Sequence, residues 1–196
     1  MAEDSPFTKA NRDNWNATSK EYQSRHHAEL EGDVLGWPSM PPERELKILG
    51  ESVADKIVLE IACGGGQSAV HLAKMGAHVT AIDFSRAQLD RARALARAKK
   101  VAIRFHETNA QDLSPLDDAS FDIAFSAYAL GFVEDIPGAF REIERVLRPG
   151  GLFAFSWMSP FYAITEERGL LVKRSYFDRS PIVSKEAHET EVDFHR

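Results

Sequence analysis

The sequence predicts an α/β fold of the doubly wound type, in which helices cover both faces of a mostly parallel sheet. Short apolar runs alternate with helical patterns along the chain, and three glycines follow the first of these runs. That first run is nearly continuous, which is typical of a strand buried on both faces of a parallel sheet. Open sheets of this kind bind ligands beyond the carboxyl ends of their strands, so a site is expected in the loops at that edge.

The first βαβ unit is predicted between residues 57 and 83. Residues 42–50 (PERELKILG) fit a short helix with a glycine stop before it. Residues 57–62 (IVLEIA) then predict the first strand, and Gly64 to Gly66 make the turn into a helix that stops at Gly76. Residues 78–83 (HVTAID) predict the second strand.

The second half of the predicted sheet follows the same alternation. Ser85 with glutamine three places on is a capping-box pattern that starts a helix. A helix opened by Pro137 carries apolar residues on one face. The remaining elements are a third strand at 101–105, a fourth at 121–125, the RPGG helix stop at 148–151 and a fifth strand at 152–157.

The two ends of the chain carry weaker patterns. Residues 1–40 are polar and irregular, and we expect residues 1–41 to form an N-terminal extension or lid on a domain at 42–196. After Trp157, residues 167–178 fit a helix or a strand, and 191–196 resemble the start of a strand.

Composition excludes several classes of protein. The 196 residues suit one folded domain, with 43% hydrophobic and 28% charged residues. A net charge of −6 disfavours nucleic acid and anionic membrane surfaces as partners. No apolar run of about 18 residues occurs, and the single cysteine, Cys63, suits a reducing compartment, so a cytoplasmic protein is expected. The histidines are scattered apart from His26 and His27, and no metal site is expected.

The glycine turn and a distant acid together indicate an adenosine-containing ligand. Gly64, Gly66 and Ala69 satisfy a dinucleotide-binding fingerprint in which glycines let a ligand approach the backbone. Asp83 ends the second strand, where a carboxylate accepts from the hydroxyls of a ribose. The alternative for Asp83, a helix cap, is less favoured because Ser85 supplies one. A nicotinamide cofactor and other adenosine cofactors both remain open on these residues alone.

From about residue 54 to 157, the chain resembles the class I S-adenosylmethionine-dependent methyltransferases, specifically their small-molecule branch. The family's acidic and glycine-rich motif is matched by Glu60, Ala62 and Gly64, Gly65 and Gly66, with alanine where the first glycine is usual. The resemblance implies S-adenosylmethionine as cofactor. It implies that Asp83 binds the ribose and that Glu60 binds the amino group of the methionine part.

The resemblance extends to the adenine side of the expected site and to a fourth motif. Phe84 matches a position that packs on adenine, and Asn109 and Ala110 fall where the family has Asp-Ala, so that an amide oxygen replaces the acid. Residues 120–156 are similar to the family's fourth strand, helix and fifth strand, including RVLRPGG. Because reductases do not share that segment and no Tyr-x-x-x-Lys pair is recognisable, an NAD(P)-dependent oxidoreductase is the disfavoured alternative.

Methyl transfer needs alignment and exclusion of water more than an invariant catalytic group. Weak candidates for a base or for orienting the acceptor are Tyr22, His26 with its neighbour His27, and Tyr128. The SAYA sequence at 126–129 differs from the motif of DNA adenine and protein glutamine methyltransferases, so a small-molecule acceptor is expected.

The family generally completes its sheet with two further strands, and only 39 residues follow Trp157. We therefore expect a C-terminally truncated domain that lacks the last strands, with a homo-oligomer as one outcome of an incomplete sheet edge. A noncatalytic module that binds S-adenosylmethionine is the second alternative.

Overall fold

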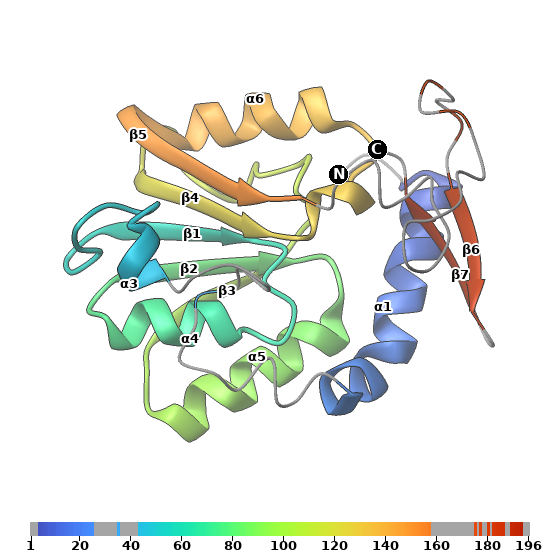
Figure 1. Ribbon diagram of the computed structural model, residues 1–196, viewed down its shortest axis with the longest axis horizontal. Coiled ribbons are helices and arrows are strands. Elements are labelled where there is room, and N and C mark those ends of the chain that lie inside the picture. Colours follow the sequence, from blue (N-terminus) through green and yellow to red (C-terminus); the bar gives the residue numbers. More distant parts are fainter. Residues whose placement is uncertain are drawn as a thin grey trace.

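The computed structural model describes residues 4–25, 35, 43–157, 175, 177, 180, 182–186 and 189–193. Their centre is a five-stranded parallel sheet with the order β3-β2-β1-β4-β5, and helices lie on both of its faces (Figure 1). The predicted doubly wound fold is therefore confirmed. The strands of this sheet are β1 (Ile57–Ile61), β2 (His78–Asp83), β3 (Ile103–Glu107), β4 (Phe121–Ala127) and β5 (Leu147–Ser156).

The connections place α4 and α5 on one face of the sheet and α6 on the other (Figure 1). On the first face, a buried cluster joins Val58 of β1 and Phe125 of β4 to Leu72 and Leu89, which come from α4 and α5. On the second face, residues of α6 such as Ile143 pack against the sheet. The helices of the domain are α3 (Glu43–Leu46), α4 (Gln67–Lys74), α5 (Arg86–Lys99), the 3₁₀ turn η1 (Leu130–Phe132) and α6 (Ile136–Val146).

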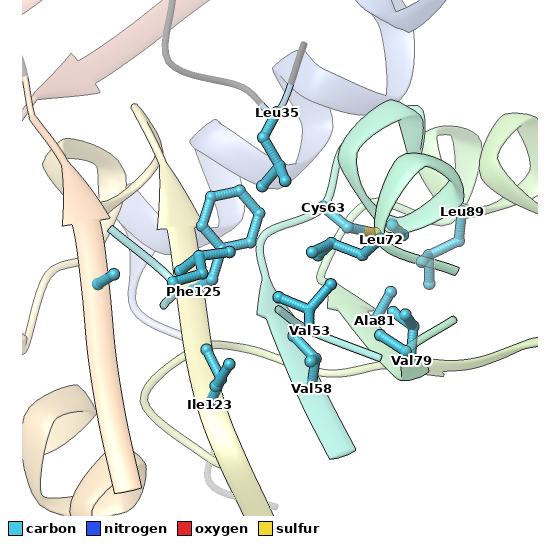
Figure 2. Close-up of a cluster of buried hydrophobic side chains, with 14 residues drawn as sticks. Leu35, Val53, Val58, Cys63, Leu72, Val79, Ala81, Leu89, Ile123 and Phe125 are labelled. Carbon is cyan, nitrogen blue, oxygen red and sulfur yellow. The ribbon is translucent and has the colours of Figure 1, made fainter. Parts of the chain in front are cut away.

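Leu35 contributes to the first cluster from the N-terminal part of the chain. Its side chain is fully buried and lies beside Phe125, close to the carboxyl end of the sheet (Figure 2). Cys63 belongs to the same cluster and is buried, so its thiol is a core group rather than a reactive one. Burial raises the pKa of this thiol well above its usual value.

The prediction that residues 1–40 are irregular is wrong for residues 6–25, which form α1 (Pro6–Arg25). Ser5 caps this helix, since its Oγ accepts from the Thr8 N–H at 3.1 Å, and Pro6 takes the first helical position. The helix carries no apolar stripe, and its buried side chains are polar, which is why hydrophobic periodicity does not reveal it. Figure 1 shows α1 beyond the carboxyl ends of the strands.

Two further differences concern the end of the domain. The RPGG segment does not terminate a helix, because α6 ends at Val146 and residues 148–151 lie within β5. β6 (Ile182–Glu186) and β7 (Glu189–Asp193) pair antiparallel as a separate hairpin, which lies on the far side of α1 from the sheet (Figure 1). The expected strand near the C-terminus is thus found in β7, whereas β6 was not expected. Most of the ambiguous segment 167–178 lies outside the described residues.

Candidate functional site

The turn between β1 and α4 has an open face. Ala62, Gly64 and Gly66 all adopt positive φ angles, of 54°, 52° and 79°. A Cβ added to Gly66 would lie 2.7 Å from the Cβ of Ala92 in α5, so this glycine allows close packing of the turn on a helix. A Cβ added to Gly64 would meet no atom within 4 Å. The space beside Gly64 is therefore open, whereas Gly66 serves the packing.

Asp83 links the end of β2 to this turn. Its Oδ2 accepts from the Gly64 N–H and its Oδ1 from the Ser85 N–H, both at 2.8 Å. Burial raises the pKa of Asp83 to about 6, against the opposing effect of the backbone N–H groups of Ser85, Gly64 and Phe84. Each carboxylate oxygen keeps a second lone pair, so these internal bonds are compatible with the acceptance of ribose hydroxyls.

The cap predicted for α5 is confirmed in one of its two halves. Ser85 Oγ accepts from the Gln88 N–H at 3.2 Å, so Ser85 and not Asp83 caps the helix. The Gln88 side chain does not return to Ser85 and instead accepts from Ser19 Oγ of α1 at 3.0 Å.

Glu60 carries a buried carboxylate oxygen without a partner. The residue is 4% exposed, and no donor among the described residues reaches its Oε2. Desolvation by burial raises the pKa of Glu60 to about 8, a backbone N–H from Ala69 acts in the opposite direction, and the charge of Asp83 adds to the rise. A buried carboxyl oxygen of this kind needs a hydrogen-bond donor, and a ligand ammonium group is a suitable one.

The loop after β3 brings the expected adenine contacts to the same edge. Asn109 Oδ1 accepts from the Gln111 N–H at 3.2 Å, which leaves one lone pair of this oxygen for a ligand. Ala110 is 6% exposed and its side chain belongs to the core, so only its backbone could face a ligand. Phe84, which is partly buried, directly follows Asp83.

α1 covers part of this edge through polar contacts that sequence reasoning missed. Asn16 Oδ1 accepts from Ser85 Oγ at 2.9 Å and from the Ala87 N–H at 3.1 Å, which completes the N-terminus of α5. A Cβ added to Gly65 would lie 2.6 Å from the amide nitrogen of Gln23, so this side chain rests on the glycine turn. The sequence signals for the helix that carries these residues are the Ser5-Pro6 pair at its start and the opposite charges four residues apart in Lys9–Asp13 and Glu21–Arg25.

The three weak catalytic candidates fall in different places. Tyr22 lies on α1, where its ring makes an edge contact with Trp15 at a centroid distance of 5.2 Å. Tyr128 follows β4, is 37% exposed and has a φ of 56°. His26 lies outside the described residues, as does His27.

Within the ranges given above for the structure, no group of three or more His, Cys, Asp or Glu side chains could hold a metal ion. Among the helices that the structure describes, none combines the length and the apolar character needed to cross a membrane.

Comparison with known proteins assigns the chain to a family. The family described as "Methyltransferase domain" matches residues 59–155. The O-methyltransferase resE of Aspergillus sclerotiorum is 38% identical over 118 residues, which are 58% of this chain and 44% of that protein. A ubiquinone biosynthesis O-methyltransferase of Alkalilimnicola ehrlichii is 33% identical over 52% of this chain and 41% of that protein.

A solved structure agrees. The S-adenosylmethionine-dependent methyltransferase from Mesorhizobium loti is 27% identical with a TM-score of 0.58, over 84% of this chain and 66% of that one. This chain therefore belongs to the class I S-adenosylmethionine-dependent methyltransferases, and S-adenosylmethionine is the cofactor of that class. It spans less than half the length of the two curated relatives named above. The family match decides between the adenosine cofactors that the glycine turn and Asp83 left open.

Proposed function

We propose that this chain binds S-adenosylmethionine at the carboxyl edge of the sheet and transfers its methyl group to a small-molecule acceptor. The observation that carries the proposal is the combination of an open position at Gly64 with two buried carboxyl groups beside it. Asp83 is bonded to the Gly64 N–H, and Glu60 retains an oxygen without a donor among the described residues. These groups fit the hydroxyls and the ammonium of the cofactor.

The roles of the site residues follow from their positions. Asp83 would accept from the ribose, Glu60 would hold the ammonium group, and the turn at 62–66 would pass under the ligand. Asn109, Ala110 and Phe84 would surround the adenine, with Asn109 Oδ1 accepting from its amino group. The cofactor supplies a methyl group already activated by the sulfonium, so the protein mainly aligns the two reactants and excludes water.

Tyr128 is the residue we assign to the acceptor side. A tyrosine in the left-handed region costs about 1–2 kcal/mol, and here the backbone is held by a bond from the Tyr128 N–H to the Ser156 carbonyl at 3.1 Å. A strained backbone conformation of this kind persists only where the surrounding structure imposes it, and such residues gather at functional sites. The exposed ring follows β4, at the edge of the sheet where ligands bind. We propose that Tyr128 orients the acceptor, with no fixed requirement for a base.

A transfer assay tests this function. The protein is incubated with S-adenosylmethionine labelled in the methyl group and with a panel of small hydroxylated acceptors, since two of the curated relatives are named as O-methyltransferases. We expect labelled product with at least one acceptor, and a lower kcat/KM for Tyr128→Phe with unchanged cofactor affinity. The matched control is Tyr22→Phe, which removes the hydroxyl from a ring that packs on Trp15.

The outcomes separate the proposal from its alternatives. Binding of S-adenosylmethionine without transfer to any acceptor would favour the noncatalytic module. Transfer that does not respond to Tyr128→Phe would remove the tyrosine hydroxyl from the reaction and leave the function intact.

A further inference from the structure

Arg145 of α6 makes an unusual number of bonds for a partly exposed side chain. Its Nε and Nη2 donate to the two carboxylate oxygens of Glu142 at 2.9 and 2.8 Å, a bidentate pair on one helix. The same guanidinium donates to the carbonyls of Leu113 at 2.8 Å and Leu116 at 3.0 Å. Asp118 accepts a further bond from Nη1 at 2.5 Å. Most of these bonds leave the helix and reach the loop between β3 and β4.

Glu142 binds the same loop as a hydrogen-bond acceptor, whereas Arg145 binds it as a donor. Its Oε2 accepts from the Leu113 N–H at 3.0 Å, so both the amide and the carbonyl of Leu113 are bonded to this pair. Arg145 in turn lowers the pKa of Glu142, which keeps the carboxylate ionised and the pair intact. A guanidinium fork fixes direction as well as distance, which an ammonium group at the same place would not do.

The braced loop is the one that carries the expected adenine contacts. Asn109 and Ala110 lie three or four residues before Leu113, and the Asp112 N–H donates to the Asn109 carbonyl at 2.9 Å. Thr108 Oγ1 donates to the Asp112 carbonyl at 2.6 Å. The segment from 108 to 113 is thus a tight, hydrogen-bonded unit, and its C-terminal end is the point held by Glu142 and Arg145.

Hydrophobic anchoring alone does not fix this unit. Ala110, Leu113 and Leu116 are buried in the cluster under α6, which sets how deep the loop sits. Buried apolar contacts are non-directional, so they do not fix the orientation of the loop backbone. Hydrogen bonds depend on direction and can fix it. The bonds to the Leu113 and Leu116 backbone supply that direction.

We propose that Arg145 and Glu142 are a positioning pair, which orients the 108–113 loop so that the Asn109 side chain reads the amino group of the cofactor's adenine. This inference rests on the proposed function, because Asn109 is assigned to adenine there. Arg145 does not touch the ligand and acts through the loop.

The experiment compares two probes that differ only on one edge of the base, at the amino group and at the adjacent N1, which carries a hydrogen in the oxo form. Affinities for S-adenosylhomocysteine and S-inosylhomocysteine, in which an oxygen replaces that amino group, are measured by calorimetry for the native chain and for Arg145→Lys. We expect the native chain to prefer the adenine probe by about tenfold, the value of one hydrogen bond at the upper end of its usual range. Arg145→Lys keeps the charge and loses the fork, and we expect this preference to fall to about twofold or less.

A matched control, Arg148, lies three residues after Arg145 in the RVLRPGG motif. Arg148 pairs with Asp122 at 2.6 Å and does not contact the loop, so Arg148→Lys should keep the native preference. If Arg145→Lys does not fold, Glu142→Gln carries the test, because its amide oxygen still accepts from Leu113 while the ionic pair is lost. It should lower the preference in the same direction.

The two affinities distinguish a positioning role of Arg145 from a merely structural one. A fall in affinity for both probes by the same factor in Arg145→Lys would show a merely structural role and overturn the proposal. A native chain that binds both probes equally would overturn it too, because Asn109 would then not read the amino group. Failure of the native chain to bind either probe would instead refute the proposed function.

Discussion

Ala62 occupies a backbone conformation that favours glycine, and the free-energy cost of this conformation can be measured. Its φ of 54° lies in the left-handed region, which disfavours any residue with a Cβ. Ala62→Gly removes that strain but makes the unfolded chain more flexible, so we expect a net gain of about 1 kcal/mol in the free energy of unfolding. Urea denaturation measures it. The control Ala94→Gly, on an exposed position of α5, should lower stability by a similar amount.

Asp83 holds both the glycine turn and, in our account, the ribose. Asp83→Asn keeps the shape of the side chain and removes its charge, so we expect S-adenosylhomocysteine to bind roughly tenfold more weakly or worse. Asp90→Asn, an exposed position of α5, is the control and should change little. Calorimetry gives both affinities. Unchanged binding by Asp83→Asn would exclude the carboxylate from the site.

Helices and strands that bury apolar side chains could be predicted from the sequence. A helix that buries polar side chains could not. The run 57–62 predicts β1 because both faces of that strand are covered, and the alternation at 101–105 identifies β3 to within two residues. α1 was missed because its most buried side chains include Asn11 and Ser19, which are 0% and 1% exposed. A buried polar side chain depends on hydrogen-bond partners far away in the sequence, so no local sequence pattern indicates it.

The same reasoning applies to the candidate site. Glycines and acids at strand ends can be found from their spacing, and Gly64 and Asp83 do lie within hydrogen-bond distance. Asn16 and Gln23 could not be found, since their contacts arise only when α1 crosses the sheet edge. Likewise, a sequence pattern identifies RVLRPGG but not the bonds that Arg145 makes to a loop about 30 residues earlier.

The polar docking of α1 leads to a prediction about cofactor exchange. Gln23 rests on Gly65 and donates to Gln88 Oε1 at 3.4 Å, so this side chain shields the glycine turn from solvent. Gln23→Ala should raise both the association and the dissociation rate of S-adenosylhomocysteine by about threefold or more, because its hydrogen bonds to Gln88 and from Gln67, together worth roughly 1 kcal/mol or more, are removed. Stopped-flow fluorescence measures the rates. Ser24→Ala, an exposed neighbour on α1, should leave them unchanged, and equal rates in all three proteins would contradict a covering role for Gln23.

At the scale of the whole molecule, the two buried carboxyl groups make stability depend on pH. Burial raises the pKa of Glu60 to about 8 and that of Asp83 to about 6 in the folded chain. Between about pH 5 and 8, the folded chain therefore binds more protons than the unfolded chain, and its stability falls as the pH rises. Denaturation of the native chain at pH 5.5 and 8 measures this fall.

Glu60→Gln isolates the contribution of Glu60, since a glutamine stays neutral at every pH. The loss of stability between pH 5.5 and 8 should be smaller in Glu60→Gln than in the native chain by at least about 1 kcal/mol. The same loss in both proteins would mean that Glu60 is already ionised in the folded chain.

Calorimetric titration with S-adenosylhomocysteine measures whether this sheet edge binds the S-adenosylmethionine cofactor, as we propose. NAD and NADP are titrated into the same preparation, because the glycine turn and Asp83 alone would suit them too. We expect micromolar binding of S-adenosylhomocysteine and no heat from either dinucleotide. Binding of NAD or NADP in place of S-adenosylhomocysteine would contradict this proposal.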